Sequence, residues 1–142
     1  MREILFRGRS VEFNMWVGGD LTVVEGKPYI LMFKRIDNGQ FKFKSFEVIP
    51  ETVGQFTGCC DKNGVKIYEG DIVRCAEDYC SYEVMFKDGC FCLRWYCETF
   101  ERDIYIALYD NEEVERFETE QYLEVVGNIY ETPELLEETR VP

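Results

Sequence analysis

The chain has 142 residues, a length typical of one domain, and 46% of them are hydrophobic, which excludes a disordered chain. Its formal net charge is −12, which argues against general binding to duplex nucleic acid because phosphate contact needs clustered Lys and Arg. The absence of histidine excludes Ser/His/Asp and Cys/His nucleophilic sites and His-ligated metals, so we expect a protein that is not an enzyme.

The first part of the chain predicts short β-strands, because short apolar runs and alternating patterns lie between turn signals. We expect strands over residues 4–9, 15–17, 21–24, 29–35 and 41–49. Turns are predicted over residues 25–28 and at Asn38-Gly39, where both residue types tolerate positive φ angles. In the last of these strands, alternation places Phe41 and Phe43 on one face and Lys42 and Lys44 on the other.

The second part continues with strands and tight turns. Further strands are expected over residues 53–57, 71–75, 81–86, 90–95, 104–109 and 123–130. The strand over 53–57 is expected to end at Gly58, and Asn63-Gly64, Glu69-Gly70-Asp71 and residues 87–89 predict turns. Residues 133–136 predict a helical turn with Thr132 as its cap, and residues 111–121 predict a loop or a short helix. The pattern predicts a mainly β fold, a small antiparallel β-barrel or sandwich with an SH3-like barrel element and little helix.

One segment has a denser set of turn and strand signals than any other. Its informative residues are Phe56, Thr57, Gly58, Asp61, Asn63, Gly64, Ile67, Tyr68, Glu69, Gly70, Asp71, Ile72 and Val73. This pattern resembles the signature of the YopX family of phage and prophage proteins, and residues 1–7, 84–91 and 125–136 resemble other parts of that family. The resemblance implies one YopX-like domain over residues 1–142, made in the cytoplasm of a bacterial host cell, and it implies no activity. We expect sub-domains over residues 1–50, an N-terminal β part, and 51–142, a C-terminal β-barrel part.

The acidic turn and the cysteines are candidate metal ligands. Asp61 to Gly64 resembles the start of a calcium loop, but the twelfth position is Ile72 rather than the Glu that such a loop needs, so we expect a hairpin turn. The seven cysteines include no Cys-x-x-Cys pair. A four-thiolate zinc site among the thiols of residues 75–97 stays an alternative, and we expect free thiols that pack as small apolar residues, with no metal and no cofactor.

Charge divides the chain and suggests partners. Residues 1–50 carry 8 basic and 6 acidic residues, whereas residues 51–142 carry 8 and 22. We expect a non-enzymatic phage or prophage accessory protein that works through protein contacts or as a homo-oligomer, with a host or phage protein as partner and no membrane association. The alternative is a role with nucleic acid, either weak single-strand binding or an acidic surface that imitates DNA. The candidate contacts for a single strand are Lys34, Arg35, Lys42 and Lys44.

Overall fold

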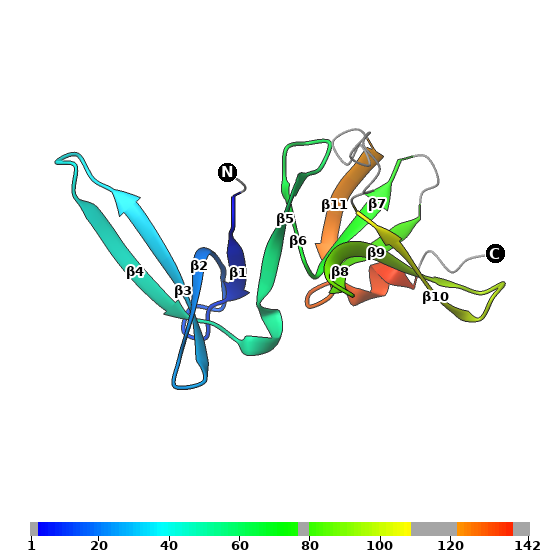
Figure 1. The fold of residues 1–142 in the computed structure, drawn as a ribbon, viewed down its shortest axis with the longest axis horizontal. Helices are drawn as coiled ribbons and strands as arrows, with labels where there is room; N and C mark the ends of the chain where they lie inside the picture. Colours follow the sequence, from blue (N-terminus) through cyan, green and yellow to red (C-terminus); the bar gives the residue numbers. More distant parts are fainter. Residues whose placement is uncertain (1–2, 77–79, 109–121, 138–142) are drawn as a thin grey trace. The chain divides into compact units, whose positions relative to one another are not determined.

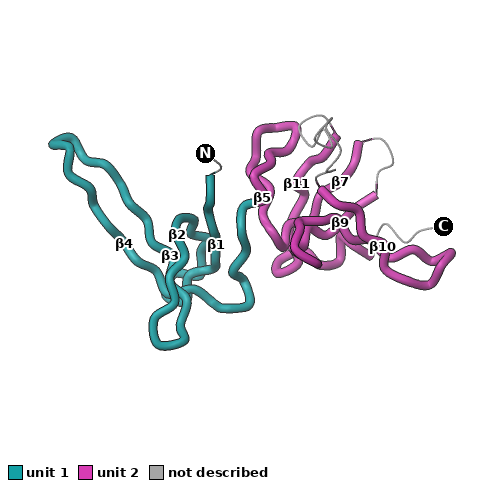
Figure 2. Tube along the Cα trace, viewed as in Figure 1, with its two compact units in different colours: residues 1–56 teal, residues 57–142 magenta. Residues whose placement is uncertain are grey.

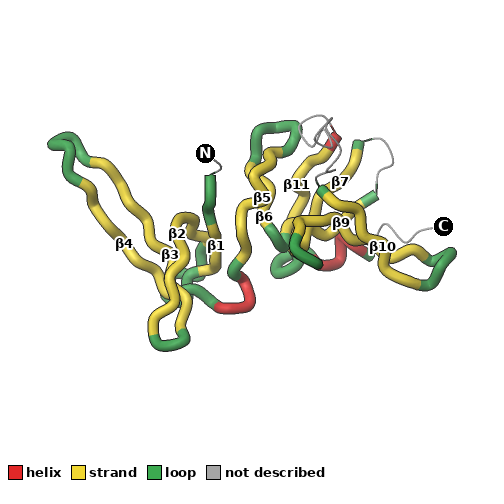
Figure 3. Tube along the Cα trace, in the orientation of Figure 1, coloured by secondary structure: helices red, strands yellow, loops and turns green. Residues whose placement is uncertain are grey.

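The structure is a computed structural model, and it describes residues 3–76, 80–108 and 122–137. The elements bounded within these residues are strands and two short 3-10 helices, so the expected mainly β class is confirmed (Figures 1 and 3). The strands are β1 (Phe6–Arg9), β2 (Trp16–Val24), β3 (Lys27–Arg35), β4 (Phe41–Glu47), β5 (Gly54–Cys60), β6 (Lys66–Tyr68), β7 (Asp71–Cys75), β8 (Ser81–Lys87), β9 (Cys90–Cys97), β10 (Arg102–Ala107) and β11 (Leu123–Asn128), and the 3-10 helices are η1 (Pro50–Thr52) and η2 (Pro133–Leu136). The loop or helix predicted over residues 111–121 lies outside the described residues.

The strands form two antiparallel sheets. One has the order β4-β3-β2-β1-β5-β6 and the other has the order β10-β9-β8-β7-β11. Neither order returns to its first strand within the described residues, so these are open sheets rather than a closed barrel. The chain divides into two compact units, Met1–Phe56 and Thr57–Pro142, called unit 1 and unit 2 below (Figure 2). The interpretation as one domain with sub-domains over 1–50 and 51–142 stays a prediction.

Unit 1 has a small core under β1 to β4. Val17, Ile30 and Val48 are buried there, and Phe6 and Phe46 pack against them. An isolated antiparallel bridge joins Ser10 to Val48, which brings the chain after β4 back to the end of β1. Gly8 permits this approach, since a Cβ at Gly8 would lie 2.8 Å from the Cβ of Val48.

Unit 2 has the larger core, formed by the five-stranded sheet with β5 and β6. Its fully buried side chains include Ile67, Val84 and Leu123. Cys59 and Cys75 are buried in the same cluster and Cys80 packs against it, as expected of thiols that act as small apolar residues. The largest part of the apolar burial that stabilises the described chain therefore lies in this unit.

Several strand boundaries differ from the predicted ones for local reasons. The two strands expected over 15–17 and 21–24 are one strand, β2, because Gly19 faces the carbonyl oxygen of Leu31 in β3 and fits there without a Cβ. β3 begins at Lys27, so the turn is confined to Glu25-Gly26, both of which have positive φ. β5 continues through Gly58 to Cys60 rather than ending there. Thr132 precedes η2 as predicted, but its side chain makes no cap.

Asp61 explains why the turn at Asn63-Gly64 holds its place in unit 2. The side chain is 2% exposed, and its Oδ1 accepts from the backbone N–H groups of Asn63 at 2.8 Å and Val65 at 2.9 Å. Its Oδ2 accepts from the N–H of Val125 in β11 at 2.9 Å. The carboxylate therefore serves as a backbone acceptor that joins the turn to β11, in agreement with the interpretation of this motif as a hairpin turn.

Within the described ranges, no helix has the length and apolar character needed to cross a membrane.

Candidate interaction surface

The most exposed part of unit 1 is the far half of the β3–β4 hairpin, residues 32–45, which we call the hairpin arm. β2 pairs with β3 only as far as Leu31, so no described strand accompanies the arm on either side. Its strands pair with each other from Met32–Lys44 to Arg35–Phe41, and the arm extends beyond β1 and β2 (Figure 1). A two-stranded hairpin of this kind has no layer of its own to bury its side chains against.

The arm has one aromatic face and one basic face. Phe33 and Phe43 are directly opposed with ring centroids 5.2 Å apart, and they are 59% and 55% exposed. Phe41 is 67% exposed and pairs with Arg35 on the same face. The expected alternation is therefore present, but neither face is a core face. Three exposed aromatic rings on one short hairpin are typical of a surface that another molecule covers.

The predicted basic residues are not all on one side. Lys42 and Lys44 lie on the face opposite the rings, and Lys34 is directly opposed to Lys42. Arg35 lies on the aromatic face, opposite Phe41. Directly opposed like charges destabilise a strand pair. An anionic group bound over Lys34 and Lys42 would therefore stabilise the arm.

The base of the arm borders a shallow depression in unit 1. The ring of Phe13 packs edge-on against Phe46 at 6.1 Å between centroids, and Val11 and Phe13 are both more than half exposed. The depression has a volume of about 140 Å³ and is lined by Ser10, Val11, Glu12, Phe13, Ser45, Phe46 and Glu47. Ligand pockets usually have roughly 300–1,000 Å³, so we interpret this depression as part of a contact surface.

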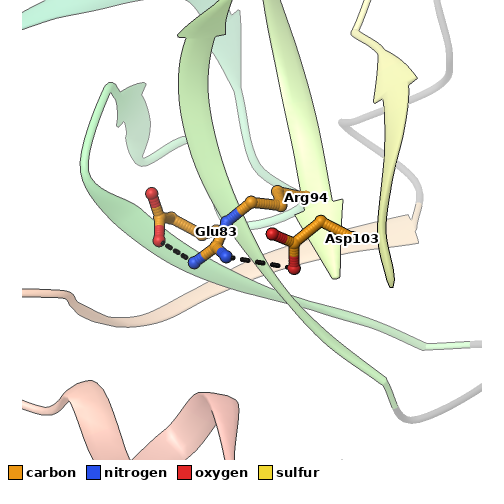
Figure 4. A network of polar contacts seen from close by, with 3 residues as sticks. All are labelled: Glu83, Arg94 and Asp103. Atoms are coloured by element: carbon orange, nitrogen blue, oxygen red, sulfur yellow. Dashed lines mark hydrogen bonds and ion pairs between the residues drawn. The ribbon is translucent and has the colours of Figure 1, made fainter. Parts of the chain in front are cut away.

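In unit 2 a polar network ties three strands together on the outer face of the sheet (Figure 4). Nη2 of Arg94 in β9 donates to Oε1 of Glu83 in β8 at 2.6 Å, and Nη1 lies 3.3 Å from Oδ1 of Asp103 in β10. Burial by itself lowers the pKa of Arg94, but the hydrogen bond and charge of Glu83, with those of Asp103, raise the pKa above its ordinary value. The network links β8, β9 and β10 through their side chains.

Unit 2 also has an exposed surface at the β9–β10 hairpin. Phe100 in the turn is 64% exposed, and Tyr105 and Ile106 on β10 are 38% and 40% exposed. Glu98 and Glu101 flank Phe100, and both are exposed. β10 is the last strand in the order of its sheet, so its outer edge has no described neighbour.

The positions of the thiols bear on the alternative of a zinc site. Among the described residues there is no group of three or more His, Cys, Asp or Glu placed to hold a metal ion. Cys90 and Cys92 lie two residues apart on β9, which places them on one face of the strand as expected, and none of the seven cysteines, all of them described, is in a disulfide. Cys90 is exposed, whereas Cys92 is 4% exposed.

Alkylation is expected to separate these two thiols. Burial, helped by the nearby Cys90, raises the pKa of Cys92, so little of it is the reactive thiolate at neutral pH. Under native conditions iodoacetamide should therefore modify Cys90 well before Cys92, and both equally after denaturation. Peptide mass spectrometry measures the order, and equal rates in the folded protein would contradict the burial of Cys92.

The chain matches the YopX protein family over residues 5–137. It belongs to the YopX family. The resemblance found in the sequence is thereby confirmed, and the motif residues lie along β5, the turn at Asn63-Gly64, β6 and the start of β7.

The YopX-family chain is also similar to a solved structure, the crystal structure of protein EF1440 from Enterococcus faecalis. The two have 21% sequence identity and a TM-score of 0.52, and the match covers 96% of this chain and 99% of that one. At this identity the likeness shows the fold alone. A comparison with curated proteins finds no match.

Two features of this YopX-family chain were missed by sequence reasoning. The Glu83–Arg94 pair depends on a two-residue turn at Asp88-Gly89, which opposes Lys87 to Cys90, whereas the turn predicted over 87–89 would oppose Glu83 to Leu93. The exposure of Tyr105 and Ile106 on β10 had no sequence signal, because a strand with apolar residues on both faces is also typical of a buried strand.

Proposed function

We propose that this YopX-family chain is a non-enzymatic accessory protein of a phage or prophage, which works in the host cytoplasm through protein contacts made by its hairpin arm. The observation that carries the proposal is the exposure of Phe33, Phe41 and Phe43 on one face of an arm that no described strand covers. Aromatic residues supply much of the binding energy at protein interfaces, and the rings of Phe33 and Phe43 lie side by side with centroids 5.2 Å apart.

The test is capture from host cells that carry the phage or prophage, together with the mass of the purified protein in solution. The wild-type chain is compared with F33S/F43S and with V23S/V24S, a control that also removes two exposed apolar side chains from unit 1. We expect the wild type and the control to recover the same partner, or to self-associate equally, and F33S/F43S to lose this. Equal recovery and equal mass for all three variants would contradict a role for the arm.

The second candidate is weak binding of single-stranded nucleic acid, which the cluster of Lys34, Lys42 and Lys44 favours. Single-strand binding usually combines stacking on aromatic rings with phosphate contacts along one groove. Here the three lysines and the aromatic rings lie on opposite faces, and only Arg35 accompanies the rings. This geometry favours a protein contact over a nucleic-acid contact.

A binding measurement separates the two candidates. If the arm binds a single strand, affinity for a fluorescent oligonucleotide should fall steeply with salt and should be lost in K42E/K44E. If the arm makes protein contacts, the wild type should bind the oligonucleotide no better than K42E/K44E does.

A further inference from the structure

We propose that the partner of the hairpin arm is a second copy of this chain, with the edge of β4 in one copy pairing with the edge of β10 in the other. This inference rests on the proposed function, because it names the protein that the arm contacts. It would extend the sheet of one copy by a strand of its neighbour, a mode in which backbone hydrogen bonds give affinity and side chains give specificity.

Both edges have the properties that strand addition needs. β4 and β10 are terminal strands in their sheets, and the structure describes no strand beyond either of them (Figure 1). Each has exposed apolar side chains, Phe41 and Phe43 on β4 and Tyr105 and Ile106 on β10. Natural proteins usually block such edges. The open edges of β4 and β10 therefore favour pairing with another strand.

The charges of the two hairpins are opposite. Residues 32–45 have four basic residues and one acidic residue, a net charge of +3. Residues 98–103 have one basic and three acidic residues, a net charge of −2. The chain as a whole has a net charge of −12, and every copy presents the acidic segment 98–103, which is opposite in charge to the arm of another copy.

The side chains of β4 and β10 match in one orientation of the two paired strands. Ile104 and Ile106 lie on the face of β10 that continues the core, opposite Trp95 and Leu93 in β9. If Phe41 and Phe43 lie on that same face, Lys42 and Lys44 necessarily lie on the other.

That other face of β10 carries Asp103 and Tyr105. Asp103 is paired with Arg94, and Nζ of Lys87 lies 3.6 Å from the ring centroid of Tyr105. The groups that attract the lysines of the arm are therefore the exposed Glu98 and Glu101 in the adjoining turn.

A symmetric contact between two arms is disfavoured. It would bring Lys42 and Lys44 of one copy beside the same residues of the other, and opposed like charges destabilise paired strands. The contact is therefore between two different surfaces, arm to β10, and the charged groups specify the choice.

The test uses charge reversal on each side of the contact and analytical ultracentrifugation. K42E/K44E changes the arm, and E98K/E101K changes the β9–β10 turn. Each variant alone should self-associate at least about tenfold more weakly than the wild type, since each now opposes like charges. An equimolar mixture of the two should associate again, as should the fourfold variant, because opposite charges then face each other. E131K/E134K, which makes the same charge change at the same spacing elsewhere in unit 2, should behave like the wild type.

Three results would overturn the inference: a wild type that sediments as a monomer at every concentration, association that both charge variants retain, or a mixture that stays monomeric. The first of these leaves the proposed function standing if F33S/F43S still loses a host or phage partner that the wild type captures. Circular dichroism of every variant confirms that a loss of association does not come from unfolding.

Discussion

Replacing Asp61 with Ala is expected to destabilise unit 2 by about 3 kcal/mol or more, because each hydrogen bond to a charged group contributes roughly 1.5–3 kcal/mol. Three N–H groups, those of Asn63, Val65 and Val125, lose their acceptor in this variant. The free energy of unfolding is obtained from urea denaturation followed by circular dichroism.

Two further variants provide an intermediate case and a control for the expected loss of stability. Asp61→Asn keeps the shape of the side chain but turns one acceptor into a donor, so it should fall between the wild type and Asp61→Ala. Asp37→Ala removes an exposed acidic residue from the turn of the arm and should change stability little. If Asp61→Ala unfolded at the same urea concentration as Asp37→Ala, the carboxylate would not be a structural acceptor.

Leu123→Ala is expected to cost about 3 kcal/mol, within the range of roughly 2–5 kcal/mol for such truncations in a packed core. Leu123 is fully buried in the core of unit 2, where β11 pairs with β7. Val65→Ala, at a position 49% exposed, is the matched control and should cost much less. Similar unfolding free energies for the two variants would mean that the core around Leu123 is loosely packed.

The two substitutions should not be additive. The backbone oxygen of Leu123 accepts from the N–H of Lys62, next to Asp61, and the carboxylate of Asp61 binds Val125. Both changes therefore loosen the same junction between the turn and β11, and the double variant should lose less stability than the sum of the single losses.

Local signals in the sequence were enough to find most strands and turns. Asn63-Gly64 and Asp88-Gly89 lie in hairpin turns as predicted, since the residue types that tolerate positive φ are visible in any sequence. The prediction was wrong at Gly58, where glycine indicated a strand end but β5 continues, and between residues 17 and 21, where β2 continues through Gly19. At Gly19 the reason is the close approach of Leu31, a contact between strands that no local pattern encodes.

Only part of the candidate surface could be predicted from the sequence. The alternation of Phe and Lys predicted the two faces of the arm, whereas a two-residue turn at Asn38-Gly39 would have opposed Phe33 to Lys44 rather than to Phe43. The alternation does not predict that the rings are exposed, because an apolar face has the same sequence pattern whether or not another layer packs on it. In the same way, Asp61 was expected to be a turn residue, but its bond to Val125, 64 positions later, depends on the long-range topology.

The bond between Asp61 and Val125 also sets an order for folding during synthesis. The strands of unit 1 find their partners within the first 56 residues, so that unit can form early on the ribosome. Unit 2 cannot complete its folding until β11 has left the exit tunnel. Before then, one oxygen of the buried Asp61 carboxylate and one edge of β7 lack their partners in β11. A ribosome that stops before residue 123 therefore releases a chain with a finished first unit and an open, degradable second one.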